Sequence, residues 1–164
     1  MKFVSIIMGS KSDYEIVSEA AKTLDKFGVK YELIISSAHR SPKRTSEYVA
    51  NAEKKGAKVF IAAAGMAAHL AGAIAANTTK PVIGIPMAGS ALSGVDALYS
   101  TVQMPGGMPV GTVAIGKAGA VNAAYLAVQI LALEDDSLAS ALKADREAKV
   151  KALEEDSSKV EVIL

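Results

Sequence analysis

The sequence predicts an α/β fold: a doubly wound, three-layer domain with a mainly parallel five-stranded sheet and a C-terminal helical tail. Short apolar segments of strand length alternate along the chain with longer segments of helical periodicity. Glycine, serine or proline stands at most boundaries between them, where strands and helices are expected to end. This alternation is typical of parallel strands joined by right-handed helical crossovers.

The chain opens with one strand and one helix. Phe3–Met8 is a short apolar run bounded by glycine, which predicts a buried strand. Apolar residues recur every four positions across Ser12–Phe27, which predicts a helix. Ser12 and Glu15 fit a capping box at its start, and Gly28 fits its C-terminal stop.

A second strand, a second helix and a third strand follow. Tyr31–Ile35 and Lys58–Ala63 are predicted to be strands. Between them, Pro42–Lys55 is predicted to be a helix, with Ser41 as the N-cap and proline at the first helical position. Gly56 stands just after its end, where a helix C-terminus favours glycine.

The second half of the domain repeats the alternation. Pro81–Pro86 and Val110–Ile115 are predicted to be the fourth and fifth strands. Three helices are expected around them: Ala67–Ala76, which consists of small residues, Asp96–Gln103, and the long Ala118–Leu133. The last helix is apolar all round, which indicates deep burial or a subunit interface.

Five such units fit a flavodoxin-like sheet with the strand order 2-1-3-4-5. Residues 1–133 would form this α/β domain, and residues 134–164 a tail within the domain or in a subunit interface. Glu134–Ser158 is a charged segment with apolar residues at helical spacing, which predicts an amphipathic helix, and Val160–Leu164 is short and apolar. The tail either packs on its own subunit or clasps a neighbouring one.

The composition describes a globular chain of 164 residues, 51% hydrophobic and 21% charged. A net charge of +1 provides no general field for nucleic acid. Without cysteine, disulfides and thiol catalysis are excluded, and neither a secretory signal nor a membrane-spanning run is apparent, so we expect a cytoplasmic protein. The surplus of apolar residues favours a homo-oligomer, with a tight core as the alternative.

Three loops follow the first three strands, and both histidines of the chain lie in them: Gly9–Asp13, Ser36–Pro42 and Ala64–Leu70. Ligands of open α/β sheets bind at the carboxyl ends of the strands. With strands one, two and three as neighbours, we expect these loops to meet near the switch point between strands one and three.

The first loop suits a sugar phosphate. Gly9 lets a ligand approach the backbone, and Ser10 and Ser12 add hydroxyl donors at a helix N-terminus, where anions bind. Asp13 would repel a phosphate but can accept both hydroxyl groups of a ribose. The alternative is that Ser12 and Asp13 are ordinary capping residues.

The other two loops carry the acid–base groups. His39 can give or take a proton near neutral pH, and Arg40 offers a planar fork for phosphate. His69 lies among small residues that would let a planar ring approach, although it could instead satisfy a core hydrogen bond. A metal site formed by the histidines and Asp13 is disfavoured, because the spacing matches no standard one.

The motifs GSKSD, SAHRSP, AGMAAHLAG, PVIGIP and LSGVDALYSTVQMPGGMPVGTVAIGKAGAVNAA occur in this order over residues 3–133. Together they resemble the PurE family of purine biosynthesis. Residues 65–107 resemble its class I members, which implies N5-carboxyaminoimidazole ribonucleotide mutase activity without ATP, biotin or a metal. In that reaction a carbamate loses carbon dioxide, which stays in the pocket until the imidazole carbon attacks it. The family also implies an octamer.

The resemblance implies roles for particular residues of this sequence. His39 would be the acid/base that moves the proton, Ser10, Ser12 and Arg40 would hold the phosphate, and Asp13 the ribose. The base and carbon dioxide pocket would be lined by Ser37, Ala64, Gly65, His69 and Leu70, and Gly9 and Ala38 complete the predicted substrate-binding set.

Two other functions stay open at this stage. One is the class II activity, direct carboxylation of aminoimidazole ribonucleotide, and the other is a non-catalytic nucleotide-binding domain. Three residues depart from the family pattern: Ser41 replaces the usual threonine, Met66 a common glycine, and Ala71 the usual proline.

Overall fold

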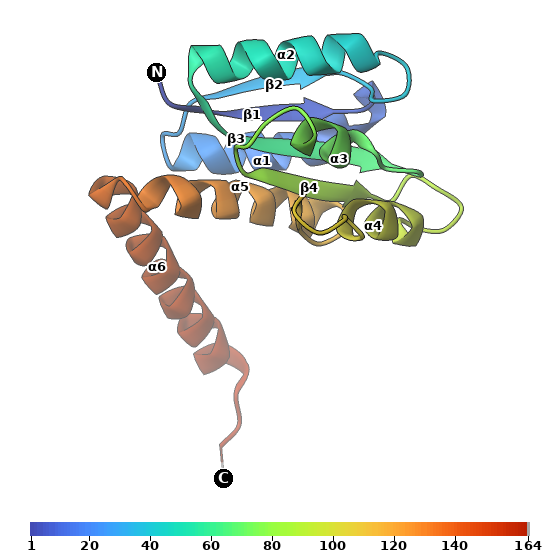
Figure 1. Ribbon diagram of the computed structural model, residues 1–164. Coiled ribbons are helices and arrows are strands. Elements are labelled where there is room, and N and C mark those ends of the chain that lie inside the picture. The colour runs from blue at the N-terminus through green and yellow to red at the C-terminus, as the bar shows by residue number, and fades with distance from the viewer. Residues whose placement is uncertain (164) are drawn as a thin grey trace. The chain divides into compact units, whose positions relative to one another are not determined.

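The computed structural model describes residues 1–163, and the chain forms two compact units, residues 1–128 and the residues from 129 onward. The first unit contains a five-stranded parallel sheet with the order β2-β1-β3-β4-β5 (Figure 1). Its strands are β1 (Phe3–Met8), β2 (Tyr31–Ile35), β3 (Ala57–Gly65), β4 (Val82–Met87) and β5 (Gly111–Thr112). The predicted fold class and strand order are confirmed.

Helices cover both faces of the sheet (Figure 1). In chain order the helices of the described residues are α1 (Tyr14–Lys26), α2 (Pro42–Lys55), α3 (Leu70–Ala75), α4 (Val95–Val102), α5 (Lys117–Ala132) and, in the second unit, α6 (Asp136–Val160). On one face, Val49 of α2 and Ile74 of α3 are fully buried in a core cluster with Phe60 of β3. On the other face, α1 and α5 lie together, with the rings of Phe27 and Tyr125 edge to face at 5.3 Å.

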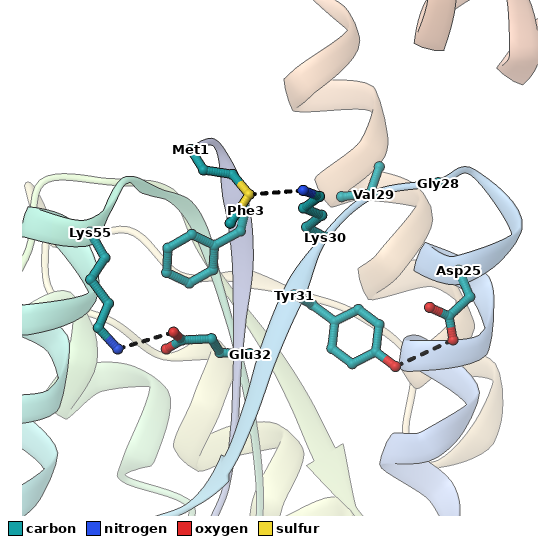
Figure 2. A pocket seen from close by; sticks show the side chains of 9 residues that line it. All are labelled: Met1, Phe3, Asp25, Gly28, Val29, Lys30, Tyr31, Glu32 and Lys55. Atoms are coloured by element: carbon teal, nitrogen blue, oxygen red, sulfur yellow. Dashed lines mark hydrogen bonds and ion pairs between the residues drawn. The ribbon is translucent and has the colours of Figure 1, made fainter.

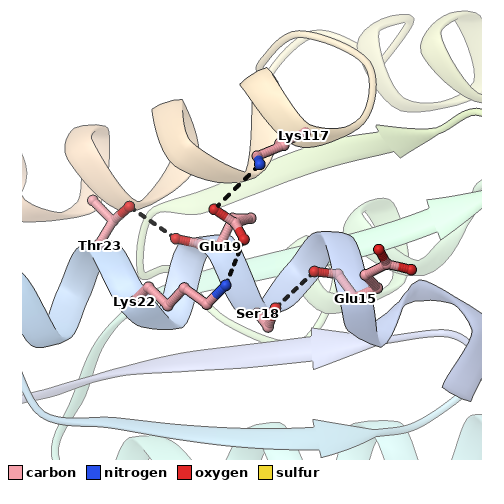
Figure 3. A network of polar contacts seen from close by, with 6 residues as sticks. All are labelled: Glu15, Ser18, Glu19, Lys22, Thr23 and Lys117. Atoms are coloured by element: carbon pink, nitrogen blue, oxygen red, sulfur yellow. Dashed lines mark hydrogen bonds and ion pairs between the residues drawn. The ribbon is translucent and has the colours of Figure 1, made fainter.

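A polar contact also joins α1 to the start of α5 (Figure 3). The Glu19 carboxylate accepts a hydrogen bond from Lys22 Nζ at 2.7 Å and lies 3.8 Å from Lys117 Nζ. Both lysine side chains are well exposed, so these ion pairs add little to the free energy of unfolding. The apolar contacts between the helices and the sheet therefore hold this face together.

Burial follows the position of each strand in the sheet. Every residue of β1 and β4 is buried, whereas β2, the edge strand, is only partly buried. Ser5 is the polar exception in β1; its hydroxyl lies 3.0 Å from the hydroxyl of Tyr48, which donates to Glu32 at 3.0 Å. A buried hydroxyl needs such a partner, so this chain of contacts ties α2 to the first two strands.

The predicted capping box is wrong by two residues. A 3₁₀ turn, η1 (Lys11–Asp13), precedes α1, and its N-cap is Ser10, not Ser12. Ser10 Oγ accepts from Ser12 N at 3.3 Å, and the Asp13 carboxylate accepts from Ser10 N at 3.2 Å. Ser10 and Asp13 have the same spacing as Ser12 and Glu15, and it is Ser10 and Asp13 that form the capping box.

The third helix is shorter than predicted. α3 begins at Leu70 and not at Ala67, so His69 stands at its N-cap position and not within the helix. Met66 has a φ of 56°, in the left-handed region, and breaks the regular backbone after β3. A glycine at this position would adopt that conformation without strain.

The second unit consists of the end of α5 and the helix α6. Asp135 caps α6, because its carboxylate accepts from Ser137 N at 3.0 Å and from Leu138 N at 3.2 Å. The helix predicted for the tail is thus confirmed. Within the described part of the chain, no helix combines the length and the apolar character needed to cross a membrane.

Candidate active site

The loops after β1, β2 and β3 meet around one cavity of about 570 Å³ at the carboxyl edge of the sheet. The structure brings together every residue predicted for the site on this cavity. They are Gly9, Ser10, Ser12, Asp13, Ser37, Ala38, His39, Arg40, Ala64, Gly65, His69 and Leu70. The parallel register of the three strands explains this convergence, since their carboxyl ends share one edge.

Four further residues line the cavity: Met66, Ala67, Met87 and Gly89. Met87 ends β4, which pairs with β3 so that Gly65 lies opposite Met87, and Gly89 lies in the loop just after the strand. The signal for them was present in the sequence, because a fourth strand next to the third brings its own carboxyl end to the same edge.

The first loop presents hydroxyl groups around a helix start. Ser12 Oγ donates to Ser10 Oγ at 3.0 Å, and Gly9 N donates to the carbonyl of Ala63 at 3.0 Å. Partial burial raises the pKa of the Asp13 carboxyl above its ordinary value, opposed by the Ser10 N–H and by the charge of Arg40. The loop therefore combines an anion-binding helix start with a carboxylate that can accept from hydroxyl groups.

Arg40 connects the second loop to the first. Its Nη2 donates to the carbonyl of Gly9 at 2.7 Å, and its backbone N–H donates to Ser37 Oγ at 3.1 Å. These hydrogen bonds go to neutral oxygens and not to a carboxylate. The positive charge is therefore held at the mouth of the cavity, where a phosphate would meet it.

The two histidines are in direct contact. His39 Nε2 lies 2.6 Å from His69 Nδ1, and the ring planes are close to perpendicular at 89°. A hydrogen bond between two imidazole nitrogens contains one proton, so one ring donates and the other accepts. A proton held by His39 can therefore be passed to His69 and back without a large movement of either ring.

Small and apolar residues form the wall beside the histidines. Ala64 and Gly65 end β3, and Leu70, which is 2% exposed, begins α3. Among the residues that the structure describes, no three His, Cys, Asp or Glu side chains are grouped closely enough to hold a metal ion. The cavity thus brings a pair of hydrogen-bonded histidines together with the Arg40 guanidinium and a wall of small and apolar residues.

Comparison with known proteins identifies the family. Residues 3–152 match the family model described as AIR carboxylase. The chain belongs to the AIR carboxylase family. Among curated relatives of this AIR carboxylase family chain, the N5-carboxyaminoimidazole ribonucleotide mutase of Haemophilus influenzae is 56% identical over 144 residues, 88% of each chain. The Escherichia coli protein of the same name is 52% identical over 146 residues, 89% of this chain and 86% of that one.

A solved structure shows the same family relationship. The crystal structure of Treponema denticola PurE matches this AIR carboxylase family chain with a TM-score of 0.89 at 29% sequence identity, covering 99% of this chain and 100% of that one. The resemblance to PurE predicted from the motifs is confirmed.

This member of the AIR carboxylase family also has a cavity at the amino ends of β1 and β2 (Figure 2). Its volume is about 820 Å³, larger than that of the histidine-lined cavity. Four of its polar side chains form two pairs, Lys55 with Glu32 at 3.1 Å and Tyr31 with Asp25 at 3.3 Å, and Lys30 donates to the sulfur of Met1 at 3.0 Å. None of the described residues that line it is a histidine, so the larger cavity is not the one that contains the acid–base groups.

Proposed function

We propose that this chain is an N5-carboxyaminoimidazole ribonucleotide mutase, which converts that ribonucleotide into 4-carboxy-5-aminoimidazole ribonucleotide. The observation that carries the proposal is the contact between His39 and His69 beside the Arg40 anion site. The curated relatives that are more than half identical to this chain, and that bear this name, support it.

Substrate binding is proposed to begin at the first loop. Ser10, Ser12 and Arg40 would hold the phosphate, and the Asp13 carboxylate would accept hydrogen bonds from the ribose hydroxyls. A ribose fixed there directs its base toward Ser37 and the two histidines, since all of these residues line the same cavity. Holding the substrate at its phosphate end thus orients the reacting end.

The chemical step needs one proton given and one taken. The bond between the carbamate carbon and the exocyclic nitrogen breaks, carbon dioxide leaves, and His39 supplies a proton to that nitrogen. The ring carbon then attacks the carbon dioxide, forming a carbon–carbon bond, and His39 removes the proton from the same ring carbon. The sum is an isomerisation, which consumes no ATP and needs neither biotin nor a metal.

The wall of the cavity would keep the two fragments together. Carbon dioxide carries no charge and accepts hydrogen bonds only weakly. A small cavity that excludes water is therefore needed to retain it. Ala64, Gly65 and Leu70 would provide such a chamber. Recapture within it replaces an encounter between two free molecules with an intramolecular one.

A second candidate is direct carboxylation of aminoimidazole ribonucleotide, because the family model is described by that activity. The same histidine and the same phosphate site would serve it. The higher identity to the curated mutases favours the first candidate.

We also propose that the chain works as a homo-oligomer, and specifically as an octamer. Four large apolar side chains of the α4 region are 44–64% exposed: Leu92, Val95, Tyr99 and Val102. Other copies of the chain would bury these side chains, and residues 134–164 would pack on a neighbouring subunit. We expect the enzyme in the cytoplasm, since a phosphorylated ribonucleotide does not cross a membrane unaided.

The test is to mix the purified protein with N5-carboxyaminoimidazole ribonucleotide, without ATP, bicarbonate or metal, and to follow the ultraviolet absorbance of the product. Product formation would establish the mutase. Carboxylation of aminoimidazole ribonucleotide only at high bicarbonate would favour the second candidate. Binding without turnover of either would leave a nucleotide-binding domain.

A further inference from the structure

Two buried hydroxyl groups lie next to the turn that carries His39. Ser36 follows β2, Thr45 lies in the first turns of α2, and each is only 2% exposed. Their hydroxyl oxygens are 2.8 Å apart. Neither belongs to the described residues that line the cavity, so substrate contact does not account for them. Burying a hydroxyl is costly unless it is hydrogen-bonded, which makes their partners informative.

The hydroxyl groups of Ser36, Thr45 and Ser41 form a connected set of hydrogen bonds that ends at Ser37. Thr45 Oγ1 donates to the carbonyl of Ser41 at 3.1 Å and is left to accept from Ser36 at 2.8 Å. Ser41 Oγ in turn donates to the carbonyl of Ser37 at 3.1 Å and accepts from the N–H of Ser37 at 3.1 Å. Thr45 Oγ1 also lies 3.4 Å from the carbonyl of Ser37.

Ser37 is therefore fixed at each of its polar atoms. Besides the contacts with Ser41 Oγ, its carbonyl accepts from the N–H of Ser41 at 2.9 Å, and its own Oγ accepts from the N–H of Arg40 at 3.1 Å. The turn of residues 38–40 starts from this fixed residue and contains His39. The position of Ser37 thus sets where the His39 ring can reach His69.

The Arg40 side chain is held by a hydrogen bond to a neighbouring loop, and the His39 side chain has no corresponding hydrogen bond to that loop among the described contacts. The guanidinium donates to the carbonyl of Gly9, on the neighbouring loop, at 2.7 Å. The His39 side chain is exposed, and its described hydrogen bond is the one to His69. A small shift of Ser37 would consequently disturb the histidine contact more than the anion site.

We propose that Thr45 is a positioning residue for the reaction: its buried hydroxyl, acting with Ser36 and Ser41, fixes Ser37 and thereby the His39–His69 contact. The inference rests on the proposed function only where turnover is the readout. It assigns Thr45 no contact with the substrate, and it predicts that losing the hydroxyl affects the chemical step more than substrate binding.

The test compares three variants of the full chain. Thr45→Val keeps the shape and removes the hydroxyl, whereas Thr45→Ser keeps the hydroxyl. Tyr48→Phe is the matched control, because Tyr48 is also on α2 and its hydroxyl makes part-buried contacts of similar length, to Ser5 and to Glu32, both at 3.0 Å. We expect kcat of the mutase reaction to fall at least tenfold in Thr45→Val with KM changed less than threefold, since a small misplacement of a catalytic group is costly.

Two results are expected to accompany that loss. Thr45→Ser should stay within about threefold of the parent kcat, and Tyr48→Phe should keep the parent kcat even where its melting temperature falls as far as that of Thr45→Val. The nitrogen-15 spectrum of the imidazoles should change in Thr45→Val and not in Tyr48→Phe. A parent kcat and an unchanged imidazole spectrum in Thr45→Val would overturn the inference.

The imidazole spectrum also separates this inference from the proposed function. A folded parent that turns over neither ribonucleotide would overturn the proposed function alone, because the spectra of the same variants still decide whether Thr45 positions His39. If Thr45→Val does not fold, Ser36→Ala removes the hydrogen bond to Thr45 from the other end and carries the same expectations.

Discussion

His39 and His69 lie thirty positions apart in the sequence and 2.6 Å apart in the structure. The sequence predicted that both lie at the same edge of the sheet, but not that they touch. Their contact depends on the tight turn that projects His39 and on the N-cap position of His69, details that strand and helix periodicity does not encode. Two acid–base groups predicted separately thus become one proton-sharing unit.

Replacing His39 by asparagine tests whether proton transfer by His39 is needed for turnover. His39→Asn keeps a side chain able to hydrogen-bond to His69 but cannot exchange a proton near neutral pH. We expect turnover of the carbamate substrate to fall by about 10²–10⁴-fold, the usual contribution of general acid–base catalysis. Calorimetric titration should show ribonucleotide binding within a few-fold of the parent, and parent-like turnover would contradict the proposed role.

The ionised carboxylate of Asp13 lowers the free energy of unfolding, and its proposed role in binding the ribose would explain why such a residue stands there. Burial raises the pKa of its carboxyl above the ordinary value of 3.8, so the folded chain holds the proton more tightly than the unfolded chain does. The corresponding stability is present below the unfolded pKa and is lost as the pH rises through the folded pKa. At neutral pH the ionised carboxylate therefore lowers the free energy of unfolding.

Asp13→Asn should separate the two effects. The amide oxygen can still accept from the N–H of Ser10, so we expect a melting temperature at pH 7 equal to or above that of the parent. That difference should disappear below about pH 4, where the parent carboxyl is protonated. Affinity for the ribonucleotide should fall about tenfold or more, the scale of a lost hydrogen bond to a charged group. Unchanged affinity would place the ribose elsewhere.

At the scale of elements, the sequence predicted most reliably what is apolar and clearly bounded. β1, β2 and α2 have the predicted bounds, because glycine, serine or proline stands at their ends. The start of α1 was predicted less well, since Ser10 and Ser12 each precede an acidic residue by three positions. Only the three-dimensional turn decides which serine caps.

The fifth strand was predicted as Val110–Ile115, but the regular ladder covers only Gly111 and Thr112. Pro86 explains why it stops. Its carbonyl accepts from Gly116 N at 2.9 Å, so the side of Pro86 that faces the end of this segment has no N–H to donate. A regular parallel ladder cannot continue past a residue without that donor. The proline was visible in the sequence, but its orientation toward β5 was not.

Gly84 gives a prediction for how β4 packs against its neighbours. A Cβ atom there would lie 2.4 Å from Cγ2 of Thr101 and 3.3 Å from Cβ of Ala71. Thr101 is buried and its hydroxyl donates to the carbonyl of Ala97 at 2.7 Å, so it cannot easily turn away. We expect Gly84→Ala to lower the free energy of unfolding by about 1–3 kcal/mol, measured by urea denaturation.

Gly106 provides the control for that measurement. A Cβ atom at Gly106 would have no neighbour within 4 Å among the described residues, and its φ is not in the left-handed region. Gly106→Ala should therefore change the urea midpoint very little. Equal midpoints for both variants would contradict the close packing between β4 and α4.

At the scale of the whole molecule, two helices expose apolar surface that a single copy does not use. α6 runs for 25 residues, and among its described side chains none is buried. An isolated helix gains little stability from propensity alone, so burial of an apolar face is what normally holds one in place. The exposed side chains of α4, such as Tyr99 at 64%, point to the same need. Association of several copies would meet both needs at once.

The tail itself offers the sharpest test of association. Val150 and Leu153 lie three positions apart on one face of α6 and are 50% and 72% exposed. If α6 clasps a neighbouring subunit through this face, the double variant Val150→Lys/Leu153→Lys should lower the sedimenting mass or raise the protein concentration needed for assembly. Lys151→Gln, between the two positions, is the matched control and should sediment as the parent does. A double variant that assembles like the parent would show that this face of α6 is not part of the interface, because two buried ammonium groups without partners would not be tolerated there.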